Sequence, residues 1–368
     1  MIDRCALSRT WGARGYGLLE LLIATAIGVV ILAVLLRFAS SAHTLAGVQG
    51  ETVDVHQRLR VAVEAMRHDL MLAGAGPIRG PSGGPLNRVF PPILPVRIGL
   101  TGSDAELSFH PDRISVLYVP AHGPQTRVAV DMVSAGSPIE IDANPPGCRP
   151  SSACDFVVGT DVLIYEAGGV GAAHEVFTVG AVDAASNLLT PSAPLSRPYL
   201  GAAQVAAVVR RTYYLDAQGK RLMMYDGARS DVPLVDHVVD LQFAYYGDPR
   251  PDSIPPPAPG ASNCAYAGSP PVSLLTNLGG DGPKPMPPSI LTDGPSCGQP
   301  PFQFDADLLR LRRVSFTIRV EAESAEFRGR GIGFSSPGVS RASARAVPDV
   351  QTTVDVAPRN MPARIFIP

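Results

Sequence analysis

One acidic side chain occupies a position where its charge is costly. Glu20 lies near the start of the run LLELLIATAIGVVILAVLL, Leu18 to Leu36, in which Thr25 is the other polar residue. An ionised carboxylate in hydrocarbon is unfavourable without a partner, so an acid in such a segment indicates a functional site. The sequence therefore predicts a compensating cation for Glu20, unless the side chain is protonated or reaches the lipid headgroups.

Four of the five cysteines lie in sequence typical of loops; the fifth is Cys5. Cys148 and Cys154 are six residues apart in a Pro/Ser-rich segment, and Cys264 and Cys297 bracket a Pro-rich one. In an oxidising compartment the pairing 148–154 with 264–297 is the simplest of three connectivities. A four-cysteine zinc site is the alternative, but the spacing lacks the usual C-x₂₋₄-C pairs.

Motifs for catalysis are incomplete. His174-Glu175 begins like the zinc motif H-E-x-x-H, but Thr178 stands where the second histidine belongs, so we expect these residues at a strand-edge surface. No G-x-S-x-G elbow occurs, and the seven histidines are scattered. Asp281 and Asp293, each followed by Gly, lack calcium-loop spacing and favour turns. We predict no enzyme, no cofactor and no metal.

The composition excludes further classes of protein. Over 368 residues, 45% hydrophobic and 17% charged residues exclude a disordered chain and allow a sizeable core. The net charge of −2 gives no overall positive field for a nucleic-acid backbone, so nucleic acid is not an expected partner.

The apolar run predicts a single membrane span over about residues 18–36. Its nineteen residues approach the ~20 that a helix needs to cross the hydrocarbon core. Arg4, Arg9 and Arg14 precede it, whereas Arg37 is the only basic residue in the twenty that follow. The positive-inside rule therefore places the N-terminus in the cytoplasm and exports the rest of the chain.

A cleaved signal peptide is the alternative, with Ser40-Ser41-Ala42 as its cleavage region. Against it, the apolar run exceeds the usual length of about 7–15 residues, and Glu20 lies inside it. A membrane anchor fits both observations better.

The junction Gly15-Tyr16-Gly17-Leu18-Leu19-Glu20 resembles the type IV prepilin signature, which joins a short basic leader to an aromatic residue and a Glu five positions into the mature chain. In that family a membrane prepilin peptidase cuts after the Gly and methylates the new amino terminus. The resemblance implies cleavage between Gly15 and Tyr16. The Tyr16 ammonium of a neighbouring subunit would then compensate Glu20, which would set the register of assembly.

A second helical pattern follows the apolar run. Apolar residues recur at spacings of four and three, which predicts an amphipathic stripe of Leu59, Val63, Met66, Leu70 and Ala73. Gly74, Gly76 and Pro77 should end this helix. We therefore expect one helix over residues 16–74, after a leader of residues 1–15.

Strand-like runs dominate the remaining residues 75–368, and a hairpin turn is expected at 216–219. The expected strands are 113–119, 127–133, 161–166, 175–182, 205–215, 221–225, 235–246, 312–322 and 351–356. The stretch 249–301 carries 15 prolines, which argues for a long exposed excursion rather than central sheet. The predicted fold class is α+β: a long N-terminal helix packed on a mostly antiparallel β-rich, pilin-like head with long Pro/Gly-rich loops.

Further blocks resemble PilW-type pilus assembly proteins, which are large minor pilins. They are the helix end at residues 67–74 (RHDLMLAG), the strand at 235–246 and the closing strand at 351–360. His68 and Met71 depart from the family pattern. The J-type minor pseudopilins of type II secretion are similar, which leaves the system open.

The resemblance implies a non-catalytic minor pilin that helps to initiate or cap a type IV pilus. Its expected place is the bacterial inner membrane, with a periplasmic head and incorporation into the pilus. Its expected partners are the prepilin peptidase, other minor and major pilins and the assembly platform. The alternatives are a type II secretion pseudopilin, or a membrane-anchored periplasmic enzyme or adhesin.

Overall fold

The computed structural model describes residues 17–78, 83–142, 148, 152–167, 169–248, 264–267, 282–298, 300, 302–324, 327–328 and 347–361. The leader, with Gly15 and Tyr16, lies outside these residues. The chain divides into two compact units, Met1–Val53 and Asp54–Pro368. We call the second the head unit.

The long predicted helix is present. Helix α1 spans Leu18–Leu72, and its first turn is closed by the amides of Glu20 and Leu21, which donate to the carbonyl of Gly17. The helix ends where Gly74 adopts φ +81°, a conformation that glycine tolerates best. The amide of Gly74 then donates to the carbonyl of Leu117, which connects the helix end to the sheet.

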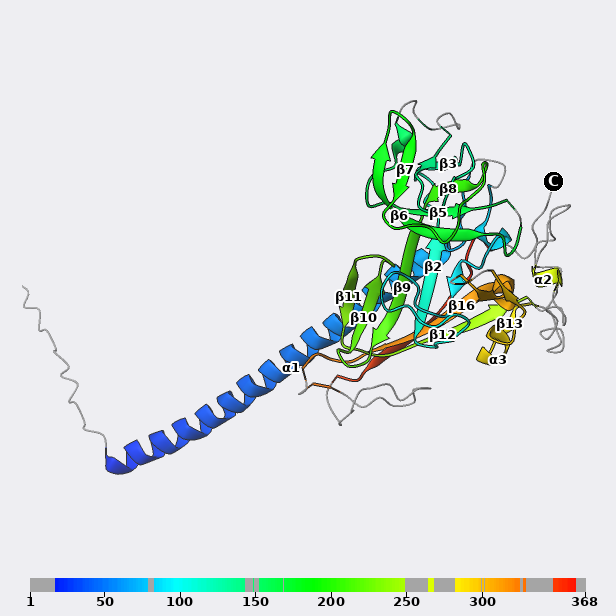
Figure 1. Cartoon of the computed structure of the whole chain (residues 1–368). Helices are drawn as coiled ribbons and strands as arrows, with labels where there is room; N and C mark the ends of the chain where they lie inside the picture. Colours follow the sequence, from blue (N-terminus) through cyan, green and yellow to red (C-terminus); the bar gives the residue numbers. More distant parts are fainter. Residues whose placement is uncertain are drawn as a thin grey trace, which may run out of the picture. The chain divides into compact units, whose positions relative to one another are not determined.

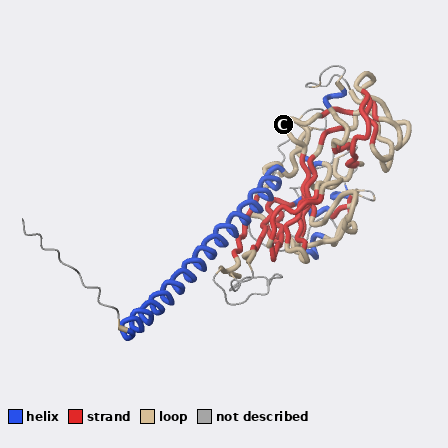
Figure 2. Tube along the Cα trace, turned by 90° about the vertical axis from the view of Figure 1, so that its left-hand side faces the viewer, coloured by secondary structure: helices blue, strands red, loops and turns tan. Residues whose placement is uncertain are grey.

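The head unit is built mostly of antiparallel strands, drawn in red in Figure 2. A five-stranded sheet has the order β1-β2-β9-β10-β11, and a four-stranded sheet the order β13-β12-β16-β17. A six-stranded sheet has the order β3-β8-β5-β6-β7-β4, and β14 and β15 form a pair. The mostly antiparallel β-rich part of the prediction is confirmed.

The strand bounds of the five-stranded sheet are β1 Ile93–Leu94, β2 Arg113–Tyr118, β9 Val209–Asp216, β10 Arg221–Tyr225 and β11 Asp231–Asp236. Those of the six-stranded sheet are β3 Gln125–Arg127, β4 Ile139–Glu140, β5 Asp161–Tyr165, β6 His174–Asp183, β7 Leu188–Pro191 and β8 Gln204–Ala207. The rest are β12 Val238–Gly247, β13 Lys284–Pro285, β14 Ser296–Cys297, β15 Phe304–Asp305, β16 Leu311–Val320 and β17 Val350–Val356, with the short helices α2 Cys264–Ala267 and α3 Pro288–Leu291.

The six-stranded sheet belongs to an insertion between two paired strands. Strands β2 and β9 are neighbours, with Tyr118 opposite Val209, yet residues 119–208 lie between them in the sequence. We call residues 119–208 the insertion lobe; its strands are drawn mainly in green in Figure 1. The lobe has its own apolar core, which includes Val162, Ile164, Leu189 and Val205.

Three expectations on strands need correction. The strand expected over 127–133 ends early: Arg127 is the last residue of β3 and Val128 only bridges Ile141, because Asp131 then accepts from the amide of Gly201 and Ser137 turns back on Ser134. The run 205–215 breaks at Val208, whose amide donates to Asp161 as the chain passes from one sheet to another. The run 235–246 breaks at His237, where φ is +59°. By contrast, the turn at 216–219 does join β9 to β10.

The Pro-rich stretch 249–301 lies largely outside the described residues. In its described part many residues are exposed, as the prolines predict, but some apolar side chains pack on the sheet. Met286, Leu291 and Cys297 are buried, and the amide of Met286 donates to the carbonyl of Tyr245. Proline excludes this segment from a central strand, but it does not prevent apolar side chains from packing on one.

Candidate functional site

The first candidate site is the N-terminal part of α1. By length and composition, the helix is long and apolar enough to cross a membrane. Its most apolar stretch of 18 residues has a mean hydropathy of 2.8, and no residue of that stretch is buried. Leucine, isoleucine and valine side chains of residues 18–36 are more than half exposed, for example Leu18 and Val29. An exposed apolar surface of this size requires a cover, and lipid is one.

The polar groups of this segment differ in their bonding. Thr25 donates its hydroxyl to the carbonyls of Leu21 and Leu22, both at 3.0 Å, so its polarity is satisfied within the helix. Glu20 is exposed in the first turn, where the helix dipole favours an anion. No described residue bonds to the Glu20 carboxylate, so the expected cation is not part of the described chain.

The head unit holds the other end of α1 through one face. The buried apolar residues there are Val55, Leu59, Ala62, Met66, Leu70 and Ala73. The predicted stripe is correct except at Val63, which is half-buried because Ala62 takes its place against the sheet. Spacings of four and three thus continue one turn further toward the N-terminus than the sequence pattern indicated.

A buried acid on this face was missed. Asp69 accepts hydrogen bonds from the hydroxyls of Tyr118 on β2, at 3.1 Å, and Tyr213 on β9, at 2.7 Å. Burial, together with the Asp69 charge, raises the pKa of both tyrosines, so both remain donors. Asp69 is three residues after Met66 on an otherwise apolar stripe, and a polar residue at such a position is the signal that could have revealed it.

The cysteines pair as the simplest connectivity predicts. Cys148 and Cys154 lie at disulfide distance in the insertion lobe, with Cα atoms 4.5 Å apart. Cys264 and Cys297, with Cα atoms 5.5 Å apart, join α2 to β14. Neither pair lies near a second pair in the manner of a four-cysteine zinc site; each is a separate crosslink.

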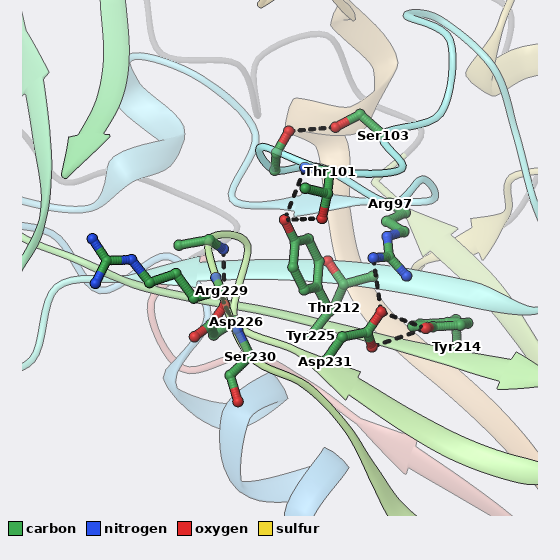
Figure 3. A network of polar contacts seen from close by, with 12 residues as sticks. Arg97, Thr101, Ser103, Thr212, Tyr214, Tyr225, Asp226, Arg229, Ser230 and Asp231 are labelled. Atoms are coloured by element: carbon green, nitrogen blue, oxygen red, sulfur yellow. Dashed lines mark hydrogen bonds and ion pairs between the residues drawn. The ribbon is translucent and has the colours of Figure 1, made fainter. Parts of the chain in front are cut away.

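A polar network braces the loop 97–104 against the five-stranded sheet (Figure 3). The Arg97 guanidinium lies 4.2 Å from the ring centre of Tyr225 and 4.8 Å from that of Tyr214, and it donates to Asp231 at 2.9 Å. The Tyr225 hydroxyl accepts from the amide and the hydroxyl of Thr101. Stacking and ion pairing of this kind position a loop without supplying a nucleophile or a general base.

Three acids meet beside α3. Carboxylate oxygens of Asp293, Asp305 and Asp307 lie within 4.8 Å of one another. Burial raises the pKa of Asp307 to about 7, although Arg310 acts against it with Nη1 3.2 Å from Oδ1. The Asp305 carboxylate accepts from the amides of Gly294 and Asp307. The cluster is therefore held largely by donors of the protein itself.

His174 and Glu175 are not strand-edge surface, contrary to the prediction. Glu175 is buried and accepts from the amide and hydroxyl of Ser196. The His174 ring stacks on Phe90 at 4.3 Å, and burial lowers its pKa to about 4. The start of β6 thus lies against the ring of Phe90 and the chain at Ser196 and is not a free surface.

Comparison of the chain with protein-family models, with curated proteins and with solved structures gives no match.

Proposed function

We propose that the protein is a minor pilin, a structural subunit that helps to initiate or cap a type IV pilus. The observation that carries the proposal is the division of α1. Residues 18–36 are apolar and exposed on all sides around one acid, whereas residues 55–73 are buried along a single stripe. A subunit that lies in lipid before assembly and packs its helix among others afterwards requires this combination.

Glu20 and the leader that ends at Gly15 suggest how subunits would pair. Cleavage after Gly15 would create an ammonium on Tyr16, and this group from a neighbouring subunit would compensate Glu20 in an apolar filament core. Such a pairing requires a second copy or another pilin, which agrees with the lack of a bonding partner for Glu20 among the described residues. Glu20 then fixes how far each subunit is inserted.

The cysteine pairs support an exported head. Disulfides persist in oxidising compartments such as the periplasm, which is where the charge asymmetry around the apolar run places residues after 36. The head would then meet other minor pilins and the assembly platform from the periplasmic side of the inner membrane.

The test is the mature N-terminus together with the location of the protein. In cells with prepilin peptidase, mass spectrometry should find a chain that begins with methylated Tyr16, and the protein should be recovered in sheared pili. Gly15→Val should leave the precursor in the membrane. A chain that begins at His43 would indicate ordinary signal peptidase and contradict the proposal.

The same experiment separates the alternatives. Recovery in secretion pseudopili, but not in pili, would assign the chain to type II secretion. Correct processing with no recovery in either filament would favour a membrane-anchored enzyme or adhesin.

A further inference from the structure

The insertion lobe carries most of the charge imbalance of the chain. Residues 119–208 contain eight acidic and three basic residues, which give the lobe a net charge of −5. Because the whole chain carries −2, the residues outside the lobe carry a net charge of +3. At low salt, the lobe of one copy therefore attracts the rest of a second copy.

One face of the six-stranded sheet is open to solvent where β6, β7 and β4 are neighbours. Asp183 on β6 lies opposite Leu188 on β7, and Leu188 lies opposite Glu140 on β4. Cross-strand partners point to the same face, and the next residue along a strand points to the other face. Leu189 and Ile139 accordingly belong to the lobe core, whereas Asp183 and Glu140 are exposed. We call Asp183, Leu188 and Glu140 the outer row.

The two carboxylates of the outer row have no basic partner among the described residues. In this respect they differ from Asp142 on the same lobe, which pairs with Arg127 at 2.8 Å. Glu140 and Asp183 are two strands apart, and neighbouring strands are about 4.8 Å apart, so their Cα atoms are separated by about 10 Å. The outer row thus presents two anions at a spacing that the sheet fixes.

The exposed side of α1 in the head unit offers two cations at the same spacing. Arg60 and Arg67 are exposed and seven residues apart, so they share one side of the helix and their Cα atoms are separated by about 10 Å along its axis. Neither forms an ion pair with a described residue, whereas Arg58 pairs with Glu323 at 2.6 Å. Glu64 lies between them and leaves this side with a net charge of +1.

We propose that the outer row of one copy docks on the exposed side of α1 in a second copy. Glu140 and Asp183 then pair with Arg60 and Arg67, because the two pairs have opposite charge and matching spacing. The contact joins two different surfaces, so each copy keeps one free outer row and one free helix side, and association continues beyond a pair. The proposal concerns the head unit alone and does not depend on the assignment as a minor pilin.

The test measures the sedimentation velocity of the full chain in neutral detergent micelles. The wild-type chain should associate, and raising the salt from about 50 mM to about 500 mM should weaken the association, since salt screens exposed charges. Association through the apolar half of α1 would not weaken with salt. A chain that stays monomeric up to about 100 µM at low salt would overturn the proposal and leave the outer row to a different partner.

Two double variants locate the contact. Glu140→Arg with Asp183→Arg makes the outer row basic, and Arg60→Glu with Arg67→Glu makes the helix side acidic. Each variant alone should associate at least about tenfold more weakly than the wild type, because its two surfaces then carry like charge. An equimolar mixture of the two variants should associate again, since each surface then meets the opposite charge. A mixture that stays monomeric would overturn the proposal.

A control separates this face from the overall charge of the lobe. Asp155 is exposed on the same lobe but outside its sheet, so Asp155→Arg should leave the association unchanged. A loss equal to that of Glu140→Arg alone would mean that net charge, and not the outer row, drives association. Because Asp183 accepts from amides of the following turn, Glu140→Arg with Leu188→Arg repeats the mixture test if Asp183→Arg fails to fold.

Discussion

The two halves of α1 show how one helix can be made for two surroundings. Residues 18–36 are apolar on every side and exposed, while residues 54–72 alternate a buried apolar stripe with exposed charged residues. Each half contains one acid among apolar residues: Glu20 in the apolar run and Asp69 on the buried stripe. Asp69 has its partners, Tyr118 and Tyr213, in the same chain, whereas Glu20 has none among the described residues. The comparison indicates that the head half is complete by itself and that the apolar half is not.

The largest expected effect follows from removing the unpartnered acid. If Glu20 pairs with the Tyr16 ammonium of a neighbouring subunit, as we propose, Glu20→Ala should abolish recovery in sheared filaments, because that ammonium would lose its counter-ion. On the same proposal, abundance in the inner membrane and cleavage after Gly15 should stay unchanged, since the substitution would remove a costly charge from the lipid phase. Glu64→Ala, an exposed acid in the head half, is the control and should assemble normally. Normal incorporation of Glu20→Ala would remove Glu20 from any role in assembly.

The stripe itself can be tested by truncating one buried side chain. Met66 is fully buried, so Met66→Ala should lower the free energy of unfolding of the head by about 2–5 kcal/mol. Val61→Ala, at a position 45% exposed on the same half, should change it by less than about 0.5 kcal/mol. Leu22→Ala in the apolar half should leave it unchanged. Urea unfolding followed by the near-ultraviolet circular dichroism of tyrosine measures all three, and a similar loss in Leu22→Ala would break the comparison.

The bonds to Asp69 predict a dependence on pH. Tyr118 and Tyr213 have pKa values raised by burial first and by Asp69 second, above the ~10 of an unfolded tyrosine. Their contribution is therefore fully present below about pH 10 and is lost as the pH rises further, because the unfolded chain ionises first. Tyr213→Phe should cost about 1.5–3 kcal/mol at neutral pH and should make the alkaline fall shallower. Tyr246→Phe is the control, and an unchanged alkaline slope in Tyr213→Phe would contradict the prediction.

The smallest effects compare one glycine from each half of the helix region. Gly74 has φ +81°, and an added Cβ would lie 3.1 Å from Pro92, so Gly74→Ala should destabilise the head by about 1–2 kcal/mol. Nothing lies within 4 Å of a Cβ at Gly28, and Gly28→Ala should leave the unfolding of the head unchanged. The midpoint temperature of thermal unfolding should fall in Gly74→Ala and stay unchanged in Gly28→Ala. Equal shifts in this temperature would mean that the backbone at Gly74 is not constrained.

Features with a local cause could be predicted from the sequence. The apolar run, the stripe before Gly74, the hairpin at Asp216 and the near-neighbour pair Cys148–Cys154 each depend on residues close together in the chain. Strands β1, β4 and β7 escaped prediction because two to four residues are too few to show alternation.

The site residues that were missed depend on distant partners. Asp69 bonds residues 49 and 144 positions away, and the ring of His174 contacts those of Phe90 and Phe302. No spacing rule relates such residues, because the insertion lobe separates β2 from β9.

The insertion lobe also has a consequence for how the chain folds. Tyr118 and Val209 face each other directly, so the lobe begins and ends at neighbouring points of one sheet. While residues 119–208 are unfolded, pairing β2 with β9 requires closing a long loop, and its entropic cost grows with the logarithm of loop length. Once the lobe has formed its own core, its two ends are already close, and the β2–β9 pairing becomes nearly as local as a hairpin. We therefore expect the lobe to fold before the sheet that carries α1, and a short loop in its place to preserve that sheet.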